Sequence, residues 1–261
     1  MTRRPVRQPT AFTLIELSVV LVVLGLLVGG ILLGRSLIRQ SQINGIVTDY
    51  NKLANAVDQF RTQYQSLPGD MLDAQEYWGV AHVTPGSCIT TASTGSETCN
   101  GNGDGAITFS NGSNEHFRFW QHLVNAGYLE GSYSGIAHGT SNTSATKVNS
   151  PAGRGDSALW FVANWASTAP ASDAFTTVYN NVLELGRAVA DSDPSGSLLN
   201  PTELWNLDKK VDDGQPGRGK LVARQITTCT NASGTPQSDL DTTYKLTNTD
   251  IACSLVFVDQ F

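Results

Sequence analysis

Oxygen-bearing side chains alternate with glycines in one segment of the chain, which reads NGNGDGA. Side-chain oxygens at Asn100, Asn102 and Asp104, followed by a glycine and the backbone carbonyl of Ala106, match the first half of an EF-hand-type calcium loop. The second half does not match, because the twelfth position holds asparagine rather than glutamate, although Glu115 lies a little further on. The segment predicts a calcium site completed by Glu115; the alternative is a Gly/Asn turn held by the cysteine before it.

Other residue patterns do not favour catalysis. The segment Gly131–Gly135 has Tyr133 at its centre, so it is not a G-x-S-x-G nucleophile elbow. None of the four histidines forms an H-E-x-x-H pair. The adjacent acids Asp212 and Asp213 precede a glycine, a pattern more typical of a solvated turn than of a hydrolytic pair. We therefore expect no enzyme activity.

A long apolar stretch contains one acidic residue. From Phe12 to Leu33 nearly every position is apolar, and Glu16 is the ionisable exception. Such a helix rises about 33 Å, enough for the ~30 Å hydrocarbon core of a bilayer. A carboxylate there costs on the order of 3 kcal/mol, so Glu16 needs a partner. Three arginines and no acid precede the stretch, which predicts a cytoplasmic N-terminus.

The residues around the start of this stretch carry a family resemblance. The run from Ala11 to Glu16 reads AFTLIE, follows a basic leader and precedes the apolar run. It resembles the signal of type IV pilins and type II secretion pseudopilins, which usually have glycine where this chain has Ala11. The resemblance implies that prepilin peptidase cuts between Ala11 and Phe12 and methylates the new amino group. It also implies that the helix first anchors the subunit in the bacterial inner membrane and then assembles with other pilin or pseudopilin subunits.

Cleavage would change the electrostatics of Glu16. In the precursor, the nitrogen of Phe12 is an amide and cannot form an ion pair. After the cut, a protonated amine on this chain or a neighbour is able to neutralise Glu16 in a low-dielectric environment. The alternative is a plain signal anchor in which Glu16 reaches the membrane interface. We expect Glu16 to set the register of assembly.

The helix is expected to continue beyond the membrane. Apolar residues recur by threes and fours from Ile43 to Tyr64, and Pro68 and Gly69 follow. The sequence therefore predicts four segments: a cytoplasmic leader (1–11), a transmembrane half-helix (12–34), an amphipathic half-helix (35–64) and a globular pilin-like head (65–261).

The head is expected to be α+β with an antiparallel sheet. Short helices are predicted at 73–78, 114–126 and 200–211, the last with Asn200 as cap, proline next and Glu203. Strands are predicted at 157–165, 175–185, 221–227 and 251–258.

Charge and cysteine content describe an exported, acidic head. The formal charge is −6, and 14 basic and 23 acidic residues remain without the leader, so nucleic acid is not expected as the main ligand. The chain has four cysteines and no C-x-x-C, which favours disulfides over a zinc site. Three pairings are possible, and the local pairing closes the smallest loops. The cysteines are Cys88, Cys99, Cys229 and Cys253.

The resemblance implies a structural subunit of a type IV pilus or a type II secretion pseudopilus, with a periplasmic head that becomes periplasmic or extracellular in a filament. One alternative is a minor or tip subunit whose large head binds a surface, DNA or an exported protein. A more remote alternative is a membrane-anchored periplasmic hydrolase.

Overall fold

The computed structural model describes residues 12–83, 87–88, 90–93, 95–108, 114–165, 173–258 and 261. The chain divides into two compact units, residues 1–42 and residues 43–261. The second unit is called the head below.

Helix α1 (Leu14–Tyr64) is the longest element and begins in the first unit. It confirms the predicted long helix, although it starts at Leu14 rather than Phe12 because Thr13 caps it. The side chain of Glu16 accepts from the Thr13 amide and hydroxyl, at 2.8 and 2.7 Å. The Glu16 amide in turn faces the Thr13 hydroxyl at 3.3 Å. This reciprocal arrangement is a capping box.

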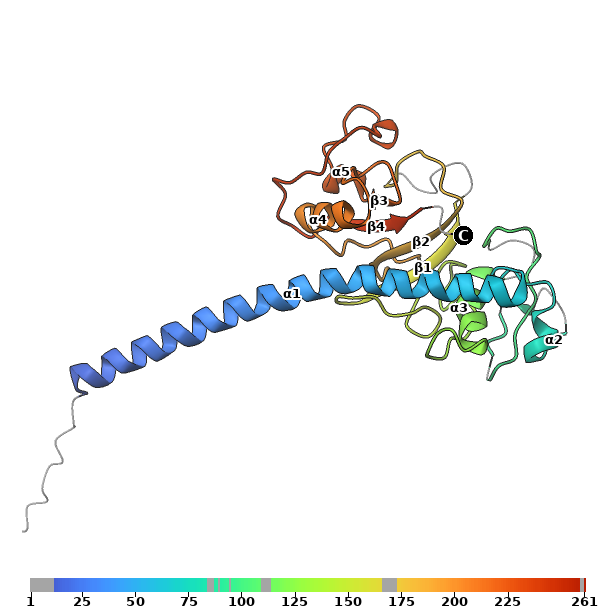
Figure 1. Ribbon diagram of the computed structural model, residues 1–261, viewed down its shortest axis with the longest axis horizontal. Coiled ribbons are helices and arrows are strands. Elements are labelled where there is room, and N and C mark those ends of the chain that lie inside the picture. The colour runs from blue at the N-terminus through green and yellow to red at the C-terminus, as the bar shows by residue number, and fades with distance from the viewer. Residues whose placement is uncertain are drawn as a thin grey trace, which may run out of the picture. The chain divides into compact units, whose positions relative to one another are not determined.

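The head contains one antiparallel sheet of four strands, which confirms the α+β prediction (Figure 1). The strands are β1 (Ala158–Asn164), β2 (Asn181–Arg187), β3 (Leu221–Arg224) and β4 (Ser254–Phe257). Their order is β1-β2-β4-β3, so the C-terminal strand lies between β2 and β3. All four are buried along most of their length, since other elements cover the sheet.

All four strands are shorter than the predicted segments, and for β2 and β3 the local cause is clear. The segment 175–180 is a turn before β2, in which the Tyr179 hydroxyl donates to the Phe175 carbonyl at 2.7 Å. β3 ends at Arg224 because Gln225 has a φ of +65°, which turns the chain out of the strand. The short helix α5 (Ile226–Cys229) follows.

Three further helices lie near their predicted positions: α2 (Ala74–Trp78), α3 (Glu115–Asn125) and α4 (Pro201–Val211). The 3-10 turn η2 (Pro236–Ser238) was not predicted. The predicted start of α4 is confirmed, with a capping box between Asn200 and Glu203. α3 is buried on nearly every side, although its sequence includes histidine, arginine and glutamine.

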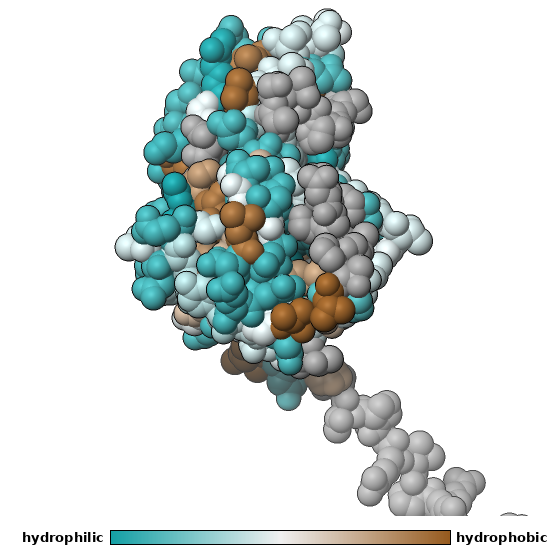
Figure 2. Space-filling model, turned by 90° about the vertical axis from the view of Figure 1, so that its right-hand side faces the viewer, coloured by the Kyte–Doolittle hydropathy of each residue, from teal (hydrophilic) through white to brown (hydrophobic). Residues whose placement is uncertain are grey.

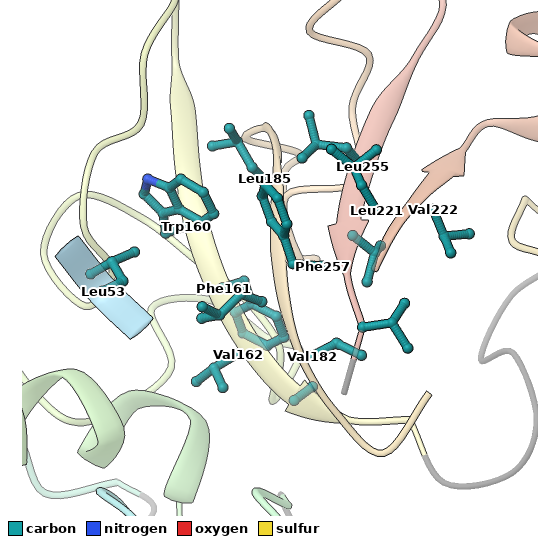
Figure 3. Close-up of a cluster of buried hydrophobic side chains, with 14 of the residues drawn as sticks. Leu53, Trp160, Phe161, Val162, Val182, Leu185, Leu221, Val222, Leu255 and Phe257 are labelled. Carbon is teal, nitrogen blue, oxygen red and sulfur yellow. The ribbon is translucent and has the colours of Figure 1, made fainter. Parts of the chain in front are cut away.

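The part of α1 that belongs to the head packs on the sheet through its predicted apolar stripe. Ile43, Leu53 and Phe60 are buried, and the Tyr50 ring stacks on Phe257 of β4 with 3.9 Å between ring centroids. Figure 3 shows Leu53 of α1 beside Trp160 of β1, next to the apolar side chains of the other strands. The face of the head in Figure 2 is mainly hydrophilic, with small separate apolar patches.

Candidate functional site

The N-terminal signature places one carboxylate in the first turn of an apolar helix. Glu16 bonds to Thr13, three residues before it, so its carboxylate caps its own helix in this chain. The sequence signal for this contact is the T-x-x-E spacing of Thr13 and Glu16. Phe12 is exposed at the end of the described segment. The predicted cleavage partner Ala11 lies outside the described residues.

The apolar side chains after Glu16 have no cover within the first unit. One helix among the described residues is long and apolar enough to cross a bilayer, and its apolar window is not buried at all. Leu14, Leu26 and Leu33 are more than two-thirds exposed, at 86, 72 and 69%. An exposed apolar surface of this size marks a membrane or protein contact, so the segment fits membrane anchoring.

The loop predicted to bind calcium, residues 100–106, is called the glycine loop here. Asp70, which is 2% exposed, accepts three of its amides: Gly103 and Asp104 at 2.6 and 3.2 Å, and Gly105 at 2.9 Å. Burial raises the pKa of the Asp70 carboxyl, while these amides act against the rise. Asp70 was not predicted as a site residue, because it lies 33 positions from Gly103 in the sequence.

The five predicted calcium ligands are mostly engaged in hydrogen bonds of the loop itself. Asn100 Oδ1 accepts from the Gln75 amide at 2.9 Å. Asn102 Oδ1 accepts from the Asp104 amide at 3.1 Å, and Asp104 Oδ1 accepts from the Ala106 amide at 2.9 Å. The side-chain oxygens of Asn100, Asn102 and Asp104 thus each accept a backbone amide.

The buried Glu115 carboxylate also accepts hydrogen bonds from backbone amides. Its two oxygens accept from the Asn102 and Thr108 amides, at 3.2 and 2.7 Å, and from the Thr108 hydroxyl at 3.1 Å. The structure brings the predicted residues together, but as a hydrogen-bonded loop rather than an open oxygen cage. Calcium binding at the glycine loop stays a prediction.

Two disulfides hold the head. Cys88 pairs with Cys99, directly before the glycine loop, and Cys229 pairs with Cys253. This is the local pairing, with sequence separations of 11 and 24 residues. The second disulfide ties α5 to the residue before β4.

A second group of oxygens lies at the end of α4, in residues 208–214, called the acidic turn here. Asp208, Asp212 and Asp213 offer carboxylate oxygens that all lie within 4.8 Å of one another. Among the described residues, this group alone has three acidic, histidine or cysteine side chains whose ligand atoms lie so close together. Asp104 and Glu115 of the predicted calcium site do not belong to such a group. The sequence pattern predicts a solvated turn at Asp212 and Asp213, and both side chains reach solvent.

One member of the acidic turn is fully buried. Asp208 Oδ2 accepts from the Tyr244 hydroxyl at 2.7 Å, whereas Asp208 Oδ1 is buried and accepts no hydrogen bond of normal geometry. Burial raises the pKa of the Asp208 carboxyl to about 7. The Asp213 and Asp212 carboxylates raise this pKa further, while Tyr244 and the Gly214 amide lower it.

A buried ionic cluster crosses the sheet and was not predicted. Arg224 of β3 forms salt bridges with Glu184 of β2, with Asp193 at 2.7 Å and with Asp173 at 3.0 Å. Burial raises the pKa of the Glu184 carboxyl to about 8, in opposition to Arg224. Because the arginine is matched by carboxylates from three segments, the cluster ties two loops to the sheet edge.

Comparison with known protein families gives a match in the N-terminal segment. Residues 7–32 match the prokaryotic N-terminal methylation motif, the signature of type IV pilins and pseudopilins. No match was found among curated proteins or among solved structures. The chain therefore carries a pilin-type signature on a long helix, together with an α+β head.

Proposed function

We propose that this chain is a structural subunit of a type IV pilus or a type II secretion pseudopilus, and not an enzyme. The observation that carries the proposal is the methylation motif at residues 7–32, placed at the start of a helix whose apolar side chains are exposed. Such a helix is stable only in a bilayer or against similar helices. An assembling subunit uses both environments in turn.

The proposed path begins with an inner-membrane precursor whose N-terminus is cytoplasmic and whose head is periplasmic. Prepilin peptidase cuts before Phe12 and the new amine is methylated. The mature helix then packs against the helices of neighbouring subunits in a periplasmic or extracellular filament. Four glycines support close helix packing, because a Cβ at Gly25, Gly29, Gly30 or Gly34 would meet no described atom within 4 Å. Nothing in the described part of this chain requires them, although each costs about 1 kcal/mol relative to alanine.

Glu16 has two proposed roles that can be separated. In the precursor its carboxylate caps α1 through Thr13. After cleavage its charge neutralises the α-amine of this or a neighbouring subunit, which fixes the register of assembly. A glutamine at this position retains an acceptor oxygen for the cap and loses the charge, whereas an alanine loses both.

The test compares wild type, Glu16→Gln and Glu16→Ala in cells that have an active prepilin peptidase and a filament assembly apparatus. Intact mass measures cleavage before Phe12 and methylation, and quantitative mass spectrometry of sheared filaments measures incorporation. We expect all three proteins to be cut and both variants to be depleted from filaments. Asp58→Asn, an exposed acid of α1 in the head, is the matched control and is expected to assemble normally.

Each readout can contradict one part of the proposal. An uncut wild-type precursor under these conditions would contradict the subunit assignment and favour a plain anchor. Normal incorporation of Glu16→Gln would remove the role of the charge, and normal incorporation of Glu16→Ala would remove both roles. The stoichiometry of the wild-type chain in the filament distinguishes a repeated subunit from a minor or tip subunit.

A further inference from the structure

The acidic turn at the end of α4 concentrates negative charge that nothing on the described chain neutralises. Asp208, Asp212 and Asp213 lie within 4.8 Å of one another through their oxygens. Among the residues that the structure describes, no lysine or arginine forms a salt bridge with any of the three. Like charges at such distances repel one another, and a proton or a bound cation would relieve this repulsion.

The nearest lysines in the sequence are turned to other partners. Lys209 places its Nζ 4.2 Å from the centroid of the Trp205 ring, in a cation–π contact. Lys210 donates to the side chain of Asn44 on α1 at 2.6 Å. The two positive charges of α4 that could have balanced the turn are thus used for packing.

One oxygen of this group is buried and accepts no hydrogen bond of normal geometry. Asp208 is 0% exposed, and its Oδ1 accepts no hydrogen bond of normal geometry, while Oδ2 is held by Tyr244. Leaving a buried carboxylate oxygen unsatisfied costs about 1–3 kcal/mol or more. The Gly214 amide also acts on this carboxylate, but it makes no hydrogen bond of normal geometry with Oδ1, which leaves room for a more electropositive partner.

The backbone of the turn is built to bring the three carboxylates together. Asp212 follows the last residue of α4, and its amide donates to the Asp208 carbonyl. Its Oδ2 accepts from the Lys220 amide. Gly219, with a φ of +82°, allows this approach because a Cβ there would overlap the Asp212 carboxylate. The C-terminal end of a helix also carries a partial negative charge and free carbonyls, which favour a cation.

We propose that the acidic turn is a calcium site whose carboxylate ligands are Asp208, Asp212 and Asp213. All three ligands are hard oxygens, the class that calcium prefers. Asp212 and Asp213 reach solvent, so water is available to complete the coordination. The site is distinct from the glycine loop, and it does not depend on the proposed filament function. Its role is to join the end of α4 to the segment that carries Tyr244.

The experiment uses the full chain in detergent after removal of metals with EDTA. Calorimetry with calcium chloride measures affinity and stoichiometry. Terbium(III) replaces calcium at oxygen sites and luminesces when a nearby indole is excited. Trp205 provides that indole, since a Cβ on Gly214 would lie 3.4 Å from its Nε1. We expect wild type to bind calcium, to show terbium luminescence that calcium displaces, and to unfold at a higher temperature with calcium.

Three variants locate the site. Asp213→Asn is exposed and keeps the oxygen that accepts from the Gln215 amide at 2.8 Å, so it should fold. We expect it to lose on the order of tenfold or more in calcium affinity, since affinity follows the number of charged ligands. Asp250→Asn, an exposed acid outside the turn, and Asp104→Asn in the glycine loop should bind as wild type does.

Defined results would overturn the site. They are no calcium heat and no terbium luminescence in wild type, or wild-type affinity in Asp213→Asn. A loss of all binding in Asp104→Asn alone would likewise overturn it and place the ion in the glycine loop.

Discussion

The glycine loop and the acidic turn are both rich in oxygen ligands, yet they satisfy those oxygens in different ways. In the glycine loop, the carboxylates of Asp70 and Glu115 accept hydrogen bonds from backbone amides. The side chain of Asn102 likewise accepts a hydrogen bond from the Asp104 amide. In the acidic turn, each of the three carboxylates accepts one hydrogen bond, from the Tyr244 hydroxyl or the Lys220 or Gln215 amide. Their oxygens nevertheless lie within 4.8 Å of one another, and Asp208 Oδ1 accepts no hydrogen bond of normal geometry. We therefore expect the balance of donors and acceptors around a group of oxygens to be a better guide to a cation site than ligand spacing in the sequence.

The difference follows from the supply of amide donors. Asp70 lies against the glycine loop where Gly103 and Gly105 have positive φ values, so successive N–H groups point toward its carboxylate. Such a concave row of amides is itself an anion site. A carboxylate already surrounded by amides gains little from a cation, whereas one that faces other carboxylates gains much.

The largest expected effect comes from removing the carboxylate that holds the glycine loop. Asp70→Ala leaves three loop amides without their acceptor and should lower the free energy of unfolding by about 4 kcal/mol. Urea unfolding of the full chain in detergent measures this loss. Asp73→Ala is the control, because Asp73 is exposed and makes no cap hydrogen bond, and it should change stability by less than about 0.5 kcal/mol.

The comparison also predicts how Asp70→Ala responds to calcium. If amides alone satisfy the glycine loop, the difference in stability between wild type and Asp70→Ala should be the same with calcium and with EDTA. A difference that grows in calcium would show that the loop binds the ion after all.

Removing the disulfide beside the glycine loop should have the next largest effect. Replacing both Cys88 and Cys99 with serine opens a loop of 11-residue separation and should cost about 3 kcal/mol on the chain-entropy model. Hydrogen exchange should show faster exchange of the Gly103 amide, while calcium affinity at the acidic turn stays unchanged. A loss of calcium affinity in this variant would show that the two regions are coupled.

Tyr244→Phe tests the acidic turn more directly. It removes the hydroxyl that donates to Asp208 and should destabilise the metal-free protein by about 2 kcal/mol. The loss should shrink in calcium, because the ion then compensates the same carboxylate. Tyr77→Phe, at an exposed ring, is the control and should be nearly neutral in thermal unfolding. Equal losses with EDTA and with calcium would argue against an ion near Asp208.

The last effect concerns acid sensitivity beside the glycine loop, and it is smallest near neutral pH. Burial, with the nearby Arg118 charge, lowers the pKa of His122 to about 3. His122 Nδ1 accepts from the Gly69 amide at 2.9 Å, which requires the neutral ring. Because the unfolded state binds the proton below about pH 6.5 and the folded state does not, stability is present above that pH and is lost toward pH 3.

The slope should be about 1.4 kcal/mol per pH unit for this histidine. Unfolding midpoints between pH 7 and pH 5, together with NMR titration of the ring protons, measure it. A His122 ring that titrates near pH 6.5 in the folded protein would contradict the assignment. His116, whose pKa burial lowers to about 4, should add loss in the same direction.

The elements of the chain could be predicted where their causes are local. The apolar stripe from Ile43 to Tyr64 and the Asn200 capping box depend on residues within a few turns, and both are present. The end of β3 could not be predicted, because it depends on a residue far away in the sequence. Gln225 has a positive φ, and the amides of Gln225 and Ile226 both donate hydrogen bonds to the Asp173 carbonyl. The burial of α3 could not be predicted from its polar composition. Its polar side chains bind groups in distant loops, as Arg118 does by donating to the Thr91 carbonyl.

By itself, the sequence determined the pilin-type signature, the long helix and the α+β composition, because hydrophobic period, capping and charge order act between near neighbours. Only the tertiary structure decided which acids meet amides and which meet one another. Asp70 reaches the glycine loop across 33 residues, and Tyr244 reaches Asp208 across 36. The physical reason is that the pairing of a buried carboxylate depends on which donors the fold brings to it, and this is not encoded in the spacing of the acids.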